Sequence, residues 1–212
     1  MSVKIKINYP NTNDKVIRTT LKGKLEEQHK YDPIYRIIEE LGVNHGSARV
    51  DIAVVNGVMH GYEIKSDRDT LQRLPEQIKA YNAVFNKMTI VVGLSHLYEA
   101  IYLVPDWWGV TLARTKSDGS LQLSEIRQAD QNLWQDNLSL ARLLWRDEAL
   151  TILESLNVAK GVRTKTRSII YERLAGNLDK RTLNDKVREK LCFRPSWRVD
   201  QKLQTNDGLV QL

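Results

Sequence analysis

Residues 49–65 read RVDIAVVNGVMHGYEIK, and this stretch decides the fold. Its first seven residues are mostly β-branched, a composition that favours extended structure. Asn56-Gly57 in the middle of the stretch is a strong hairpin signal. The sequence therefore predicts two antiparallel strands, 49–55 and 58–65.

Both expected strands carry charged residues in apolar surroundings. Asp51 is the one acid of the first strand, where an ionised carboxylate is costly unless a cation compensates it. Glu63 and Lys65 share a face of the second strand, because side chains two apart point to the same side. Phosphodiester hydrolysis by metal ions uses carboxylates that converge near a lysine. For Asp51 alone, an ion pair with Arg49 explains the pattern equally well.

The register of this hairpin decides whether the acids meet. A plain two-residue turn would place Asp51 and Glu63 on opposite sides of the sheet. A three-residue loop, 55–57, with Gly57 in a left-handed conformation would place Asp51 opposite Gly61 and diagonal to Glu63. A bulge at Gly61 would have the same effect. We expect one of these two irregularities.

The flanking segments complete an α/β pattern. In chain order they are a helix at 14–30, a strand at 34–41 for which a short helix also fits, a helix from about 74 to 85, and an apolar strand at 88–93. A helix at 95–100 and a hairpin of 109–114 with 121–126 are expected to follow. The sequence thus predicts a mixed sheet flanked by helices.

From about residue 137 the pattern is helical. It predicts a long amphipathic helix to residue 156, then helices at 166–175 and 179–192. The strand signal ends between residues 129 and 137. We therefore expect an α/β domain at 1–133 and a basic, all-helical domain at 134–212.

Positive charge is concentrated toward the C-terminus. From Val158 onward, 13 Lys or Arg residues stand against 6 Asp or Glu residues, and the first 157 residues carry a net charge of −1. Such a segment favours a polyanionic partner, although a solvated helical face explains the charges equally well. The last two helices are compatible with a helix-turn-helix that presents Lys180 and Arg181. A generic helical hairpin packed on the core is the favoured alternative.

Composition limits the class of protein. Hydrophobic residues make up 42% and charged residues 27%, as in a globular domain. The single cysteine, Cys192, excludes an internal disulfide and a cysteine-built zinc site. No apolar run reaches the roughly 20 residues of a membrane span, and residues 1–6 do not resemble a signal peptide. The expected location is cytoplasmic, without a membrane partner.

A resemblance sharpens these expectations. Asp51 with Glu63-Ile64-Lys65 resembles the metal-binding signature of the PD-(D/E)XK nuclease superfamily, and the expected element order resembles its αβββαβ core. Gln77-x-x-x-Tyr81 resembles the motif of RecB-type exonucleases. Residues 39–110, about a third of the chain, are similar to a small, largely uncharacterised bacterial and phage family of that superfamily.

The resemblance implies a metal-dependent DNA nuclease that uses Mg²⁺, with Mn²⁺ as an alternative. The implied catalytic residues are Asp51, Glu63, Lys65 and Gln77. The implied metal ligands are Asp51, Glu63, Glu40 and the backbone of Ile64, with Glu26 or Glu27 as alternatives to Glu40. The residues expected to contact nucleic acid are Arg49, Arg73, Tyr81, Lys180 and Arg181.

Two other functions fit the same residues. One is a catalytically silent nucleic-acid-binding module that keeps the fold as a scaffold. The other is a structural or partner-binding protein of a mobile-element or defence system. DNA is the expected partner in the first two readings, and a homodimer or a protein partner is left open.

Overall fold

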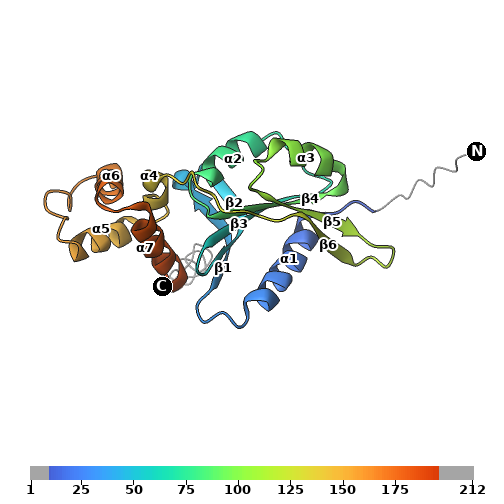
Figure 1. Cartoon of the computed structure of the whole chain (residues 1–212), viewed down its shortest axis with the longest axis horizontal. Coiled ribbons are helices and arrows are strands. Elements are labelled where there is room, and N and C mark those ends of the chain that lie inside the picture. The colour runs from blue at the N-terminus through green and yellow to red at the C-terminus, as the bar shows by residue number, and fades with distance from the viewer. Residues whose placement is uncertain (1–9, 196–212) are drawn as a thin grey trace, which may run out of the picture.

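The computed structural model describes residues 10–195, in which one six-stranded mixed sheet forms the centre (Figure 1). Its strands lie in the order in which they occur in the chain: β1 Arg36–Val43, β2 Ala48–Val55, β3 Met59–Lys65, β4 Lys87–Gly93, β5 Gly109–Thr115 and β6 Leu121–Arg127. The pairs β1–β2, β2–β3 and β5–β6 are antiparallel, whereas β4 is parallel to both of its neighbours. The strands expected from the sequence are present, with ends shifted by one or two residues.

Helices cover both faces of the sheet. The elements are α1 Asp14–His29, η1 Asn44–Gly46, α2 Leu74–Asn82, η2 Leu94–His96 and α3 Leu97–Leu103. Figure 1 shows α1 on one face and α2 with α3 on the other. Ile17, Leu21 and Leu25 of α1 are buried in a core of their own on their face of the sheet. The coarse prediction of an α/β fold is therefore confirmed.

Within the described residues, four helices follow β6. They are α4 Asn137–Ala141, α5 Arg146–Ser155, α6 Arg167–Asn177 and α7 Lys180–Phe193. The expectation of one long helix from 137 to 156 is wrong, because the chain is extended at Trp145. The backbone N–H of Trp145 donates to Glu148 Oε2 at 2.7 Å, which starts a new helix. The capping bond from Glu148 thus starts a new helix, although the helical spacing of apolar residues runs without interruption from 137 to 156.

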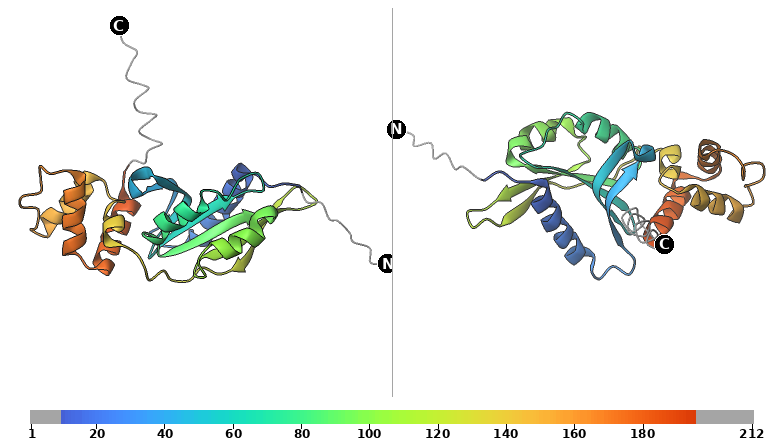
Figure 2. Two further views of the ribbon diagram at one scale, coloured as in Figure 1. Left: turned by 90° about the horizontal axis from the view of Figure 1, so that it is seen from above. Right: turned by 180° about the vertical axis from the view of Figure 1, so that it is seen from behind.

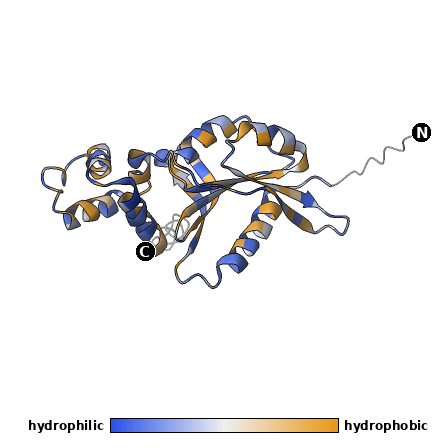
Figure 3. Ribbon diagram, in the orientation of Figure 1, coloured by the Kyte–Doolittle hydropathy of each residue, from blue (hydrophilic) through white to orange (hydrophobic). Residues whose placement is uncertain are grey.

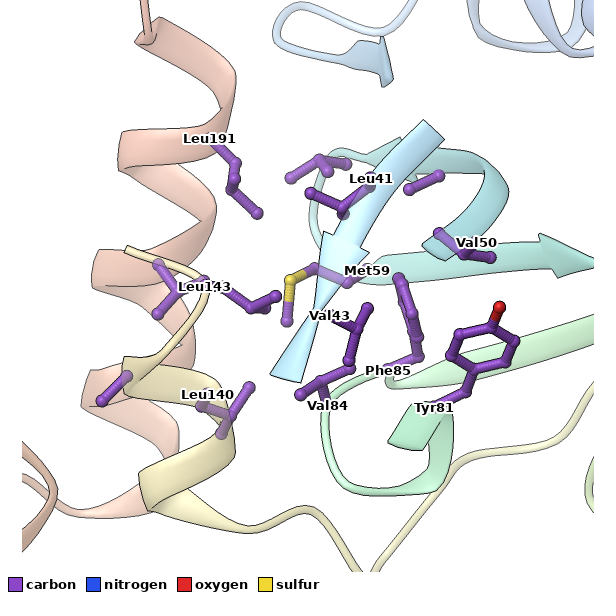
Figure 4. Close-up of a cluster of buried hydrophobic side chains, with 14 of the residues drawn as sticks. Leu41, Val43, Val50, Met59, Tyr81, Val84, Phe85, Leu140, Leu143 and Leu191 are labelled. Atoms are coloured by element: carbon purple, nitrogen blue, oxygen red, sulfur yellow. The ribbon is translucent and has the colours of Figure 1, made fainter. Parts of the chain in front are cut away.

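The helical segment shares its core with the sheet. Figure 4 shows Leu140, Leu143 and Leu191 beside Leu41 and Met59, and these side chains belong to one buried cluster. Figure 2 shows α7 next to the first strands and α6 further out. The division into two domains at residue 133 stays a prediction.

Helices α6 and α7 follow each other closely in the chain, but α6 packs on α4 and α5, whereas α7 packs on α4 and β2. Only Leu178 and Asp179 separate them, whereas a helix-turn-helix usually has three or four residues in its turn. One face of α7 is buried against the core through the side chains of Leu183, Val187 and Leu191. The remaining face is hydrophilic, as Figure 3 shows for most of this helix.

Candidate functional site

The β2–β3 hairpin sets the geometry of the predicted site. Val55 faces Met59, so the loop consists of residues 56–58. The expected loop at 55–57 with a left-handed Gly57 is wrong, and so is the expected bulge at Gly61. Asn56 closes the turn by itself, since its N–H donates to the Val58 carbonyl at 3.0 Å and its side chain accepts the Val58 N–H at 3.1 Å.

This register keeps the two acids on one side of the sheet. The pairing of the two strands ends at Ile52 and Tyr62, and beyond it Asp51 and Glu63 both line one groove. The expectation that the acids share a side therefore holds, although a different loop produces it. A hydrogen bond of 2.7 Å from the Ile64 N–H to Asp51 Oδ2 fixes the carboxylate at this point.

Glu63 lies at the centre of a buried hydrogen-bonded cluster. It is 2% exposed, and Oε1 accepts from Lys65 Nζ and from Gln77 Nε2, both at 2.6 Å. Tyr81 OH lies 2.9 Å from Oε2. Burial, and next the charge of Asp51, raise the pKa of Glu63 to about 7, against the opposing effect of Lys65. The carboxyl of Glu63 therefore titrates near neutral pH.

The phenol of Tyr81 fits a protonated Glu63. Its hydroxyl has one proton but two neighbouring acceptors, the Arg49 carbonyl at 2.7 Å and Glu63 Oε2. If Glu63 donates to Tyr81 and Tyr81 donates to Arg49, each of these oxygens is satisfied. Tyr81 is 0% exposed, so this side chain has no surface for the nucleic-acid contact expected of it.

Asp51 is held by a cation that sequence reasoning missed. Its Oδ1 accepts from Arg18 Nη2 at 2.6 Å. Burial raises the pKa of Asp51, and the Ile64 N–H and Arg18 oppose that rise. The alternative explanation, an ion pair of Asp51 with Arg49, is not among the ion pairs of the described residues. Arg49 Nη1 lies 3.7 Å from Glu40 Oε2 instead.

Arg18 joins three acids from three elements. Its guanidinium contacts Asp14 of α1 at 3.2 Å, Glu40 of β1 at 2.9 Å and Asp51 of β2 at 2.6 Å. Burial alone lowers the pKa of Arg18, but the bonds to Asp14 and Asp51 outweigh it and raise the pKa overall. The i,i+4 spacing of Asp14 and Arg18 on the first helix was the available signal.

Glu40 reaches Arg18 from an unusual backbone. Its φ of 56° lies in the left-handed region, which is uncommon for a residue other than glycine. Glu39 and Leu41 pair with β2, whereas Glu40 does not. Glu26 and Glu27, the alternatives to Glu40 as third acid, are exposed and do not line the same groove.

One groove of about 1260 Å³ collects most of the predicted residues. Those that line it are Glu40, Arg49, Asp51, Glu63, Ile64, Lys65, Arg73 and Gln77. Lys180 and Arg181 line a separate groove. The large groove contains five basic and six acidic side chains, so it offers no surplus of positive charge to a polyanion.

The two central acids of the predicted metal site each lie beside a cation of the protein. Among the residues described, no group of three or more His, Cys, Asp or Glu side chains is placed to hold one. Arg18 neutralises Asp51, and Lys65 lies against Glu63, so each of these acids has an internal cation. Ile64 contributes an N–H to Asp51. The expectation of Mg²⁺ or Mn²⁺ gains no support here and stays a prediction.

The fold and the site define an α/β protein that pairs its buried acids with its own cations. The chain belongs to the bacteriophage P4 protein cII family, whose model matches residues 10–198. It is similar to "Protein cII" of Enterobacteria phage P4, with 47% identity over 55 residues. That match covers 26% of this chain and 21% of the phage protein. No solved structure matches the chain significantly.

This membership corrects the family and the activity expected from the sequence. The identification with the PD-(D/E)XK nuclease superfamily is wrong, and so are the expected nuclease, hydrolase and restriction-endonuclease-like activities. Asp51, Glu63, Lys65, Gln77 and Tyr81 do converge, and hydrogen bonds join the last four into a polar network in which the buried Gln77 Oε1 has no partner. A short motif can predict which polar side chains lie together in the fold. The same cluster of side chains can stabilise the fold without catalysing a reaction.

None of the helices in residues 10–195 is both long and apolar enough to span a membrane.

Proposed function

We propose that this chain is a non-catalytic nucleic-acid-binding module in which the α/β part is the scaffold and the helical segment makes the contact. The order α1-β1-β2-β3-α2-β4 is the order expected of a restriction-endonuclease-like core. We keep that architecture, without its chemistry, as part of the proposal. A cytoplasmic location belongs to the same proposal.

The distribution of charge supports the helical segment as the contact surface. Residues 137–195 contain 13 Lys or Arg residues and 7 Asp or Glu residues. Residues 10–136 contain 15 and 17, respectively. Phosphates attract the segment with the positive surplus, because bound lysine and arginine release counterions from the nucleic acid.

One basic stretch carries the proposal. Lys160, Arg163, Lys165 and Arg167 are all exposed within eight residues, and the sequence has no acid between positions 155 and 171. Arg163 contacts Glu154 at 2.9 Å, which leaves most of the positive charge of the stretch facing solvent. We call residues 160–167 the basic loop.

The basic loop leads into the N-terminus of α6. Thr166, at the N-cap, makes no side-chain capping hydrogen bond, and the first turn contains no acid. The N–H groups of a helix start and the positive end of its dipole favour phosphate oxygens. The loop and the helix start therefore present positive charge to the same side of a bound strand.

The other expected contacts remain proposals on this surface or beside it. Lys180 and Arg181 are exposed at the start of α7, on the same helical segment. Arg49 and Arg73 are exposed at the large groove of the scaffold. Because acidic and basic side chains nearly balance in that groove, we propose that Arg49 and Arg73 contribute less to nucleic-acid binding than the basic loop does.

Salt-dependent binding tests the proposal. Fluorescence anisotropy with labelled single-stranded DNA, duplex DNA and RNA would compare the wild type with a variant in which the four cations of the basic loop are changed to Gln. We expect the slope of log affinity against log salt to become shallower by about 3 to 4, because each phosphate contact contributes about 0.9 on duplex DNA.

A matched variant separates local contact from net charge. Lys15, Lys24, Lys30 and Lys116 are exposed on the α/β part, and changing them to Gln removes the same charge. We expect this control to retain most of the affinity. Equal losses in the two variants, or no binding of any nucleic acid by the wild type, would refute the proposal.

A further inference from the structure

The linker before α4 has an inverted polarity. Asn132 and Gln135 are 3% and 7% exposed, whereas Leu133 and Trp134 between them are 70% and 69% exposed. Buried amides and exposed large apolar side chains on one short segment reverse the usual preference. A single exposed apolar residue needs no explanation, but two that are held out by buried polar neighbours do.

The two buried amides pin this linker to the scaffold. Asn132 Nδ2 donates to the carbonyls of Asn82 and Phe85 at 2.7 and 2.8 Å. Gln135 Nε2 donates to the carbonyl of Val84 at 2.6 Å. Because these bonds fix the backbone on both sides, Trp134 is a preorganised platform, and little conformational entropy is lost when a ligand contacts it.

Each residue of the exposed pair lines a different groove. One, of about 510 Å³, is lined by Leu133, Lys180 and Arg181 among others, and Lys180 Nζ lies 3.4 Å from the Leu133 carbonyl. The other, of about 530 Å³, is lined by Trp134 and Trp107. An exposed indole therefore lies next to a groove that carries cations.

The grooves also contain carboxylates, which would repel a phosphate unless they are paired. Asp106 and Asp130 line the second groove with Trp134. Asp106 lies 3.7 Å from Arg127, and Asp130 accepts from the Gln131 N–H at 2.7 Å. Both carboxylates thus have partners on the scaffold. The first groove also contains an acid, Asp185, which pairs with Arg188 of the same groove.

We propose that Trp134 stacks on an unpaired base and that Lys180 and Arg181 contact the phosphates next to it. The inference rests on the proposed nucleic-acid binding and adds a preference for single strands. Base faces are hidden inside a duplex but open to an aromatic platform in a single strand. Aromatic stacking beside lysine and arginine is the usual chemistry of single-strand recognition, and this combination favours a nucleic acid over a protein partner.

Variants at one position separate stacking from apolar contact. The full chain would be titrated with a labelled 20-nucleotide single strand and with the matching duplex. We expect Trp134→Leu to weaken single-strand binding at least about fivefold, from the range measured for one stacked base. Binding of the duplex should change by less than about twofold. Trp134→Phe, which keeps a ring, should retain most of the affinity. Tyr98→Leu, which removes an exposed ring of α3 that lines neither groove, should behave like the wild type.

The outcomes distinguish this inference from the proposed function. If the wild type binds single strand and duplex alike and Trp134→Leu alters neither, the stacking inference is overturned and nucleic-acid binding stands. If the wild type binds no nucleic acid, both proposals fail, and capture of a protein would then assign the platform to another partner. Thermal unfolding of each variant confirms that the exposed substitution leaves the fold intact.

Discussion

Arg18 and Asp51 form an ion pair of 2.6 Å that joins the first helix to the second strand of the sheet. The two side chains are 19% and 16% exposed, so water screens the pair only weakly. The same guanidinium also contacts Asp14 and Glu40. Arg18 therefore compensates the charge of Asp51, an acid for which the sequence predicts a metal.

Removal of the cation should destabilise the fold. In Arg18→Met, three acids lose their shared partner, and we expect the free energy of unfolding to fall by about 3 kcal/mol, as for a broken buried pair. Urea denaturation measures the change. Lys22→Met is the control, because its pair with Glu39 is about 40% exposed on both sides and should contribute less than about 1 kcal/mol.

A double variant tests whether Arg18 acts through Asp51. In Arg18→Met with Asp51→Asn, the uncompensated charge is gone, and we expect the combined loss to be smaller than the sum of the single losses by about 1 kcal/mol or more. Strictly additive losses would contradict the assignment of Arg18 as the partner of Asp51.

Glu63 should give the protein a stability that falls as the pH rises. Its pKa is raised from an ordinary value of 4.5 to about 7 in the fold, so the folded state holds the proton more tightly between these limits. Unfolding is then favoured as the pH rises through that window, by about 3 kcal/mol in total. Glu63→Gln should abolish this component, as urea midpoints measured from pH 4.5 to 8 would show. An unchanged pH profile would place the pKa of Glu63 near its ordinary value.

His60 should have the opposite effect. Burial lowers the pKa of His60 from 6.5 to about 3, and its ring lies 2.8 Å from Thr89 Oγ1. The unfolded state therefore binds the proton more tightly between pH 3 and 6.5, and stability rises with pH there by about 1.4 kcal/mol per unit. His60→Gln should remove this rise.

The effects of Glu63 and His60 overlap between pH 4.5 and 6.5. In that window we expect them to cancel largely in the wild type. Relative to the wild type, Glu63→Gln should make stability rise with pH and His60→Gln should make it fall. Profiles that shift in the same direction in both variants would contradict the two protonation states described here.

Asn132 should matter for stability far more than its exposed neighbour. Asn132→Ala leaves the buried carbonyls of Asn82 and Phe85 without this donor, and we expect a loss of about 2 to 4 kcal/mol. Leu133→Ala should stay within about 0.5 kcal/mol, because Leu133 is 70% exposed. Thermal or urea unfolding compares the two. Similar losses would show that the linker is not pinned by its buried amide.

The order of elements through β6 could be predicted from the sequence, because the spacing of apolar residues differs between helices and strands. The segments 49–55, 58–65 and 88–93 are strands as expected, within one residue at their ends. The region 137–156 could not, because Glu148 starts a new helix at Trp145 by a bond that hydropathy does not encode. The convergence of Asp51 and Glu63 was expected, but its loop was not, since the side chain of Asn56 chose the turn.

The sequence by itself determined the αβββαβ order, the isolated Asp51 in an apolar strand and the shared face of Glu63 and Lys65. Periodicity and side-chain alternation act over a few residues, and they are written directly in the chain. Only the tertiary structure decided what these charges do, because the partner of Asp51 is Arg18, 33 residues away on another element. Whether a carboxylate binds a metal or an internal cation depends on the groups that packing brings to it, and a local motif does not record them.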